Sequence, residues 1–406
     1  MIGIEAFLRR LFRVGSLEVI LPGGRRFIVG DGSAPAIAVR IADNATLGRI
    51  IAKPTLGVGE AYMDGRLSFE RGTIHDLVEL AARNTGAHPN RPASRLKRWW
   101  TKRIVERNER ESARRNVAHH YDLSLDLYRA FLDDDLQYSC AYFDRPEISL
   151  DEAQAAKKRH IAAKLNLGPG QRVLDIGCGW GGLALSLAAW EGVKVDGVTL
   201  SAEQLATAQA RAEAAGLSSR VKFSLTDYRD IAGVYDRIVS VGMFEHVGRP
   251  NYQAFFERIA SLLADDGVAL IHSIGRSEGP SVTDPFTTKY IFPGACVPAL
   301  SEVLPAVERA GLRVTDIEIL RLHYAYTLEC WRQRFMAHRE RIAKLYDERF
   351  CRMWEYYLSA AEMGFRHGGH MVFQLQLTKK IDALPVTRQY IEASERNLKA
   401  VAKRVA

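Results

Sequence analysis

The chain has 406 residues, of which 47% are hydrophobic, and it carries a formal net charge of +8. This length allows two domains, and so apolar a composition excludes a chain that is disordered throughout. No apolar run approaches the roughly 18–20 residues that cross a bilayer. Arg9, Arg10 and Arg13 interrupt the first residues, which excludes a secretory signal, so we expect a cytoplasmic protein. The five scattered cysteines predict free thiols and no metal site.

The first part of the chain predicts a small α+β domain that ends near residue 85. Residues 1–13 have the pattern of an amphipathic helix, which can lie on a membrane or cover the domain's own core. A hairpin follows, with strands at Leu17–Leu21 and Phe27–Val29 on either side of a Pro-Gly-Gly turn. Further expected elements are a strand at 37–41, helices at Thr46–Ala52 and Ile74–Ala82, and a turn at Gly59–Gly65.

Residues 86–120 predict a basic helical linker. Eleven basic and three acidic residues lie between Arg83 and Arg115, and Trp99 and Trp100 lie among them. A concentrated positive charge with aromatic residues suits an anionic surface, either phospholipid head groups or nucleic acid. It can equally be a solvated linker.

From about residue 150, apolar strands alternate with helical stretches. This rhythm predicts a mostly parallel, doubly wound α/β sheet with helices on both faces, within a catalytic domain of residues 121–406. The predicted elements are strands at 172–176, 193–198, 221–225, 237–241 and 268–273, and helices at 183–190, 202–214 and 252–263. The tail from about Thr327 is expected to be helical and rich in aromatic residues.

A glycine-rich loop follows the first strand of this alternation. The strand ends in Asp175, and the D-x-G-x-G pattern continues through Gly177 and Gly179 into a helix. Glycines let a ligand approach the backbone closely, and this pattern differs from the G-x-G-x-x-G of dinucleotide sites. A later strand is followed by Asp227 and Tyr228, which suit an adenine amino group and an aromatic stack. The arrangement resembles the class I S-adenosylmethionine (SAM)-dependent methyltransferases.

The end of the second strand departs from that resemblance. Many class I enzymes have an acidic residue there that holds the ribose hydroxyls, whereas this chain has Thr199 and Leu200, with Gln204 one turn into the next helix. Cys178, beside the glycine loop, is interpreted as a small apolar filler rather than a catalytic thiol.

Ordered segments along nearly the whole chain resemble the cyclopropane-fatty-acyl-phospholipid synthases, whose family includes the mycolic acid cyclopropane synthases. The mycolic acid enzymes generally lack the N-terminal domain, so this chain is more similar to the bacterial enzymes that act on phospholipids. The matching segments are the glycine loop and residues 57–65, 120–122, 137–142, 227–230, 237–248, 272–275, 289–293 and 324–328.

This resemblance implies roles for individual residues. Tyr138 and Ser139 would close over the methionine end of SAM, and Thr199 and Gln204 would hold its ribose. The implied SAM site is completed by Asp175, Gly177, Gly179, Leu200, Asp227 and Tyr228. A bicarbonate ion would be held by Cys140, Glu245, His272, the backbone of Ile274, and Tyr324. The resemblance also implies a lipid-binding or domain-docking surface at Gly59–Gly65 instead of only a turn.

The implied chemistry explains why such an ion is needed. Transfer of the SAM methyl group to an alkene leaves a carbocation, and ring closure then requires a base that removes a proton from the new methyl group. A carboxylate in an apolar tunnel resists ionisation, whereas a bound anion can act as the base and stabilise the cation. The predicted function is therefore cyclopropanation of the cis double bond of an unsaturated phospholipid acyl chain, with the aromatic tail lining the acyl site.

Three alternatives remain at this point. The same carbocation can give a methyl- or methylene-branched chain, the basic linker permits a soluble or nucleic-acid substrate, and a non-catalytic lipid-binding protein is disfavoured because the glycine loop is intact. The expected partners are phospholipid acyl chains, the anionic inner face of the cytoplasmic membrane and a second copy in a homodimer, with no nucleic acid. Peripheral membrane contact is expected through Arg95–Arg103 and the N-terminal helix.

Overall fold

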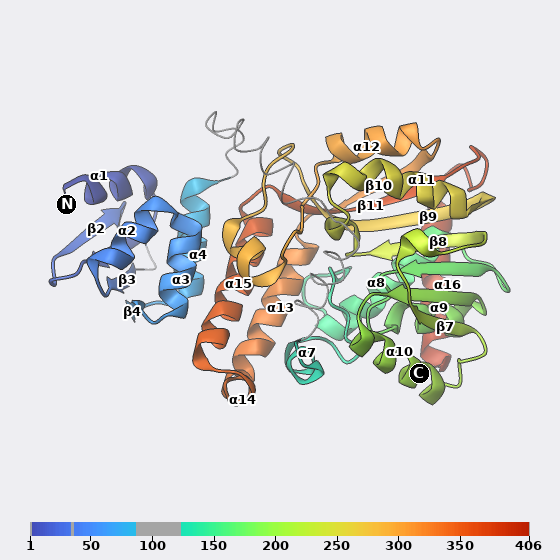
Figure 1. Ribbon diagram of the computed structural model, residues 1–406, viewed down its shortest axis with the longest axis horizontal. Coiled ribbons are helices and arrows are strands. Elements are labelled where there is room, and N and C mark those ends of the chain that lie inside the picture. The colour runs from blue at the N-terminus through green and yellow to red at the C-terminus, as the bar shows by residue number, and fades with distance from the viewer. Residues whose placement is uncertain (1, 34–35, 87–122, 406) are drawn as a thin grey trace. The chain divides into compact units, whose positions relative to one another are not determined.

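The computed structural model describes residues 2–33, 36–86 and 123–405 (Figure 1). The predictions for the basic linker and for the motif at residues 120–122 lie outside this described part. Contacts between Cα atoms group the chain into two compact units that do not follow chain order. The first unit consists of Met1–Pro92, Thr283–Pro293 and Ala325–Gly369, and the second of Ala93–Val282, Gly294–Tyr324 and His370–Ala406. The division into residues 1–85, 86–120 and 121–406 stays a prediction.

The first unit contains a four-stranded sheet in the order β2-β1-β3-β4. β1 pairs antiparallel with β2 and parallel with β3, and β3 pairs antiparallel with β4. The first of these pairings confirms the predicted hairpin. The elements of this part are α1 (Ile2–Leu11), β1 (Ser16–Ile20), β2 (Arg26–Gly30), β3 (Ala36–Ile41), α2 (Asn44–Ala52), α3 (Pro54–Met63), β4 (Leu67–Arg71) and α4 (Ile74–Thr85).

Helices from the C-terminal part of the chain also belong to the first unit. α15 contacts α3 and α4. Gly59 of α3 permits close packing, because a Cβ there would lie 2.5 Å from the ring of Phe286 and 2.7 Å from that of Tyr356. The expectation of a turn at Gly59–Gly65 was wrong, because this segment is helical as far as Met63, whereas its role as a lipid-binding or docking surface stays a prediction. The added helices are α13 (His323–Ala337, from Ala325 on), α14 (Arg339–Leu345), α15 (Glu348–Arg366) and the short helix Thr287–Ile291.

The second unit contains a seven-stranded sheet in the order β10-β11-β9-β8-β5-β6-β7. The strands from β5 to β9 run parallel, and β11 is antiparallel to both β9 and β10. This topology confirms the predicted mostly parallel sheet. The expectation that the tail from about Thr327 is helical was wrong for residues 370–378, which form β11 because they pair with β9 and β10. The strands are β5 (Arg172–Ile176), β6 (Lys194–Thr199), β7 (Val221–Leu225), β8 (Tyr235–Val241), β9 (Leu263–Arg276), β10 (Arg313–Leu320) and β11 (His370–Thr378).

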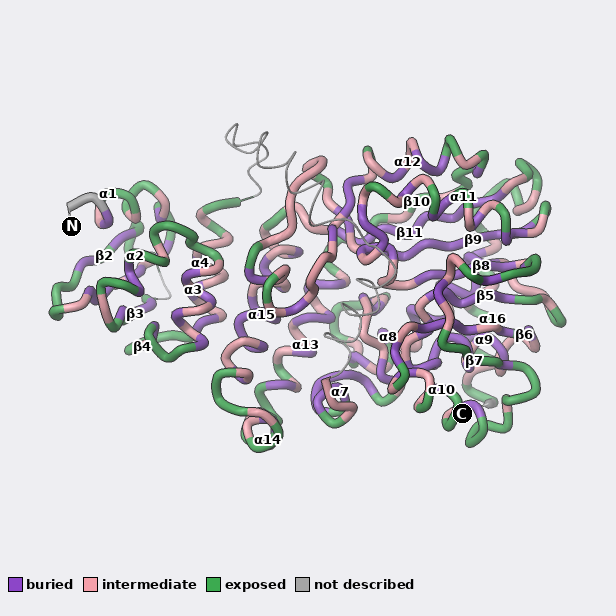
Figure 2. Tube along the Cα trace, viewed as in Figure 1, coloured by how far each residue is buried: buried purple, intermediate pink, exposed green. Residues whose placement is uncertain are grey.

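Two buried clusters lie on opposite faces of this sheet, and Figure 2 shows its central strands as buried over most of their length. Strands covered on both faces need apolar side chains on both, which explains their continuous apolar runs. Across the described residues, no helix is long and apolar enough to cross a membrane. One cluster includes α11 (Tyr252–Leu262) and α12 (Leu300–Arg309), and the other α8 (Leu150–Leu165), α9 (Gly182–Glu191), α10 (Ala202–Ala214) and α16 (Gln389–Val405).

Candidate active site

The glycine-rich loop leaves the carboxyl end of β5 and leads into α9. Gly177, Gly179 and Gly181 have φ angles of 82°, 55° and 83°, a left-handed conformation that glycine adopts without strain. The N–H groups of Gly177 and Cys178 donate to the carbonyl of Val198 at 2.9 and 3.0 Å, which fixes the loop on β6. Apart from its chain neighbours, no described residue comes within 4 Å of a Cβ built at Gly179, so this side of the loop is open to a ligand.

Asp175 is the buried acidic residue immediately before this open loop. Its Oδ2 atom has no hydrogen-bond partner among the described residues. Burial raises the pKa of its carboxyl group to about 7, and the nearby ammonium group of Lys157 opposes part of the rise. A carboxyl group with an unsatisfied oxygen at this position is suited to receive a positively charged group of a ligand.

The end of β6 has a hydroxyl–amide pair where many related folds have an acid. The Thr199 hydroxyl donates to Oε1 of Gln204 at 2.8 Å, and both side chains are buried. Ser201 caps α10 by accepting from the Gln204 N–H at 3.3 Å, and Leu200 is half-buried between them. The pair offers both a donor and an acceptor at this strand end, as a sugar hydroxyl requires.

The predicted adenine contacts follow β7. Asp227 accepts from the backbone N–H of Arg229 at 3.0 Å and from its guanidinium group at 2.8 and 2.5 Å, so part of its acceptor capacity is already used. The ring of Tyr228 meets Phe255 edge-on at 5.4 Å, which holds it in place. Contact of these two residues with adenine stays a prediction.

Residues 137–139 are held against the sheet by α8. Nζ of Lys157 donates to Oε1 of Gln137 at 2.7 Å and to Oγ of Ser139 at 2.8 Å. Nε2 of Gln154 donates to the carbonyls of Gln137 and Ser139 at 3.2 and 3.0 Å. The ring of Tyr138 lies 5.4 and 6.0 Å from two further aromatic rings. The predicted contacts at the methionine end of SAM therefore sit on a fixed segment.

Sequence reasoning did not find Gln154 and Lys157. Their spacing of three residues, which places them on one side of a helix, was the available signal. The signal is weak because lysines and glutamines on helices are usually solvated, and burial of these two is visible only in the tertiary structure.

Glu245 lies in a short helix, Phe244–His246, that follows β8, and His272 lies within the neighbouring strand β9. Oε1 of Glu245 accepts from the backbone N–H of Ile274 at 2.6 Å, and Oε2 has no partner among the described residues. Burial raises the pKa of Glu245 to about 7 and lowers that of His272 to about 3. At neutral pH the histidine is therefore uncharged, and the glutamate is close to half protonated.

The N–H of Ile274 thus bonds to Glu245 instead of remaining available to an ion. Within the predicted anion-binding set, these two residues are in direct contact. The proposed role of the Ile274 backbone in holding bicarbonate stays a prediction.

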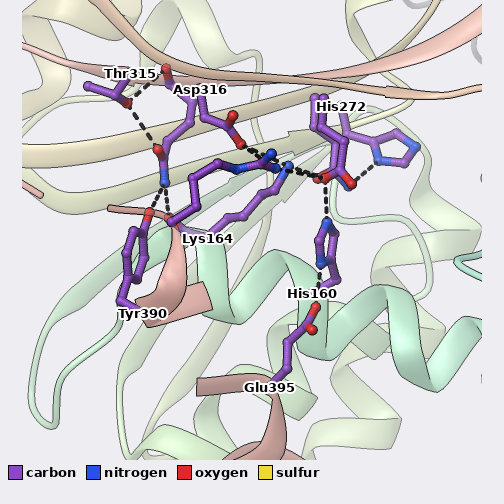
Figure 3. Close-up of polar contacts among 11 residues, drawn as sticks. His160, Lys164, His272, Thr315, Asp316, Tyr390 and Glu395 are labelled. Atoms are coloured by element: carbon purple, nitrogen blue, oxygen red, sulfur yellow. Dashed lines mark hydrogen bonds and ion pairs between the residues drawn. The ribbon is translucent and has the colours of Figure 1, made fainter. Parts of the chain in front are cut away.

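A buried polar network adjoins His272 (Figure 3). Gln374 lies opposite His272 in the β9–β11 register, and its Nε2 is 3.1 Å from His272 Nδ1. Because Nδ1 accepts this bond, the imidazole proton resides on Nε2, which can donate to an anion. His160 of α8 contacts Glu318 of β10 at 2.6 Å through Nε2 and Glu395 of α16 through Nδ1. These contacts join α8, β10 and α16, and Glu318 lies opposite Gln374 in the β10–β11 register.

A hydrogen bond and a ring contact join the chain segments that contain Cys140 and Tyr324. Cys140 is buried, and its thiol donates to the following carbonyl at 3.3 Å. The Phe143 N–H donates to Nδ1 of His323 at 2.9 Å, and the ring of Tyr142 stacks on His323 at a centroid distance of 4.9 Å. Since Tyr324 directly follows His323, these contacts bring the surroundings of the two predicted residues together.

A family model described as mycolic acid cyclopropane synthetase matches residues 108–375, more than half of the chain. The chain belongs to this family. A second model, described as a domain of unknown function, matches residues 4–91. Membership confirms the resemblance noted in the sequence and makes the chain a SAM-dependent methyltransferase with the class I fold.

Named relatives and a solved structure support the same assignment. The chain is 39% identical over 358 residues to the cyclopropane-fatty-acyl-phospholipid synthase of Escherichia coli strain K12, covering 88% of this chain and 92% of that protein. It is 37% identical over 395 residues to the tuberculostearic acid methyltransferase UfaA1 of Mycobacterium tuberculosis, with coverages of 92% and 90%. A crystal structure of mycolic acid cyclopropane synthase CmaA1 complexed with SAH and CTAB matches at 35% identity and a TM-score of 0.61, covering 65% of this chain and 97% of that one.

The residues at the carboxyl ends of β5 and β6 fit SAM as the co-substrate. The open side of Gly179 admits a ligand close to the backbone, and the unsatisfied Oδ2 of Asp175 can accept from an ammonium group. The hydroxyl–amide pair of Thr199 and Gln204 can exchange hydrogen bonds with a ribose.

Proposed function

We propose that this methyltransferase acts on the cis double bond of an unsaturated phospholipid acyl chain and converts it into a cyclopropane ring. The observation that carries the proposal is Glu245, fully buried with one oxygen bonded to backbone and the other without a partner among the described residues. The relative in Escherichia coli is named for this reaction, and the CmaA1 structure is complexed with CTAB. Both support an acyl chain as the substrate class.

The proposed reaction has two bond-forming steps. The alkene electron pair attacks the methyl carbon of SAM, the carbon–sulfur bond breaks, and S-adenosylhomocysteine (SAH) leaves with that electron pair. A carbocation then remains on the acyl chain. Loss of a proton from the transferred methyl group provides the electron pair for the second carbon–carbon bond, which closes the ring.

The residues around Glu245 fit a small bound anion. A pKa of about 7 keeps the protonated form of Glu245 populated at neutral pH, and this form can donate from the unpaired Oε2, while neutral His272 can donate through Nε2. We propose that Cys140 and Tyr324 complete this site. A bicarbonate ion bound there would supply the base for ring closure and a negative charge close to the carbocation.

Product analysis tests the proposal. Purified protein is incubated with SAM and vesicles of unsaturated phospholipid, with bicarbonate present or removed, and the fatty acid methyl esters are analysed by mass spectrometry. We expect the acyl chain to gain one CH₂ with a cyclopropane fragmentation pattern, at a rate that falls when bicarbonate is removed. An unchanged rate would assign the base to Glu245 itself, and no acyl product would overturn the substrate class.

A second product class has a specific observation in its favour. The relative UfaA1, at 37% identity, is named a tuberculostearic acid methyltransferase rather than a cyclopropane synthase. A methyl- or methylene-branched acyl chain is therefore the alternative product. The fragmentation pattern of the same esters distinguishes it from a ring.

Peripheral membrane contact forms a separate part of the proposal. Phe7 of α1 is 47% exposed beside Arg9 and Arg10, and the basic segment Arg95–Arg103 follows later in the chain. We propose that residues 1–85 act as an accessory lipid-contacting domain, and that this protein works as a homodimer at the inner face of the cytoplasmic membrane. Reversing charges within Arg95–Arg103 should weaken sedimentation with anionic vesicles, and unchanged sedimentation would refute membrane contact. Light scattering tests the dimer.

A further inference from the structure

Lys157 differs from the other buried lysines of α8 because its partners are neutral. Its side chain is fully buried, and two of its three N–H donors bond to Gln137 and Ser139. By contrast, Lys158 pairs with Asp135 at 2.5 Å, and the fully buried Lys164 pairs with two carboxylates of β10. Burial lowers the pKa of Lys157 to about 8, and the carboxylates of Asp133 and Asp135 oppose this shift without bonding to the ammonium group. An anion supplied by a ligand would offset more of the cost of burying this charge.

Ser139 can transmit the charge of Lys157 to such a ligand. Because Lys157 donates to its Oγ, the hydroxyl proton of Ser139 must point toward another acceptor. Ser139 is only half-buried, and its Cβ lies 4.0 Å from a Cβ built at Gly242, just beyond the end of β8. The hydroxyl therefore stands at the same edge of the sheet as Asp175, because β8 pairs in parallel with β5.

Asp175 supplies the opposite charge at this edge. Lys157 stabilises its carboxylate from a distance, and Oδ2 has no partner among the described residues. The Asp175 carboxylate and the Lys157 ammonium group are both buried and are not bonded to each other. Together they are complementary to a zwitterion. The α-amino acid end of SAM has this form, with one ammonium and one carboxylate group.

We propose that Lys157, acting through Ser139, is the positioning residue that recognises the methionine carboxylate of SAM. The inference rests on SAM as the co-substrate and is independent of the acyl substrate and its product. Ser139 makes the direct contact, while Lys157 orients its hydroxyl group and strengthens it as a donor to an anion.

Ligand binding without turnover tests this role. Calorimetry measures the Kd of the full chain for SAH and for decarboxylated SAH, which lacks only the carboxylate. We expect the wild-type protein to prefer SAH by about tenfold to a hundredfold, as for a hydrogen bond to a charged group. Lys157→Met should reduce the preference to roughly threefold or less, mainly by weakening SAH binding.

Lys164→Met is the matched control, since it removes a buried lysine from the same helix and should keep the wild-type preference. If Lys157→Met does not fold, Ser139→Ala must reduce the preference instead. A wild-type preference in folded Lys157→Met overturns the proposal, whatever Ser139→Ala shows. If only Ser139→Ala can be measured, a wild-type preference in that variant overturns it.

Discussion

Replacement of Glu245 by glutamine tests two properties of this residue separately: its contribution to acyl product formation and the free energy of unfolding that is lost because its carboxyl group is buried. The amide keeps the shape of the side chain and an oxygen that can accept from the Ile274 N–H. It removes the charge and therefore the dependence on pH. We expect Glu245→Gln to lose roughly a hundredfold or more in acyl product formation, because an amide, unlike a carboxyl group, cannot exchange a proton with the bound anion.

The same substitution should stabilise the folded protein at high pH. Burial raises the pKa of Glu245 from 4.5 to about 7, so the unfolded chain releases this proton more readily than the folded one. Stability is therefore lost as pH rises from 4.5 to about 7 and is constant above it. At about 1.4 kcal/mol per pKa unit, the wild-type penalty grows by about 2 to 3 kcal/mol between pH 5 and pH 8.

Urea unfolding of the wild type and Glu245→Gln at both pH values measures this difference. The cost of burying the new amide is the same at pH 5 and pH 8, so it cancels in the comparison. The variant should gain about 2 to 3 kcal/mol relative to wild type on going from pH 5 to pH 8. A stability difference that does not change with pH would refute the assignment of Glu245 as a buried carboxyl group with a raised pKa.

Three further substitutions probe the surrounding structure. In Gly182→Ala, the new Cβ would lie 2.4 Å from Oδ2 of Asp135 and 2.5 Å from Nε2 of Gln137, so both side chains, close to Ser139 in the chain, must move. We expect calorimetry to show SAH binding at least about tenfold weaker, and wild-type affinity would contradict this. Gln374→Leu removes the hydrogen-bond partner of the His272 imidazole, whose role in the anion site is proposed above; it should lower kcat roughly tenfold with unchanged SAH affinity, whereas weaker SAH binding would point to general distortion. Hydrogen bonds to two carboxylates hold the pKa of His160 above 6.5, so the stabilisation by its charged form is complete at pH 6 and is lost as pH rises through the raised pKa. His160→Gln should therefore lower the free energy of unfolding more at pH 6 than at pH 9. Equal losses at the two pH values would be inconsistent with the raised pKa.

Five of the seven strands of the second unit could be predicted from the sequence, whereas β10 was not predicted and β11 lies in a tail that was expected to be helical. The strand at 172–176 and the helix at 202–214 have the predicted bounds. Buried parallel strands must be short apolar runs between turn residues, and Ser201 marks the start of the helix as an N-cap. These signals are local, so they can be recognised without the tertiary structure.

The remaining features depend on contacts between distant parts of the chain. The glycines of α3 look like turn residues in the sequence, but Gly57 and Gly59 lie within the helix, and glycine is needed there because neighbouring elements leave no room for a side chain. Likewise, Lys157 has no sequence feature that distinguishes it from a solvated lysine. Its burial arises because residues 137–139 fold over α8.

The transfer of a trideuterated methyl group from SAM tests the central claim most directly. If the transferred carbon loses a proton and closes a ring, the acyl product retains two of the three deuterium atoms and shows the cyclopropane fragmentation pattern. Retention of all three deuterium atoms would mean that no proton leaves the methyl group. That result would contradict the proposed ring closure and the role assigned to the site around Glu245.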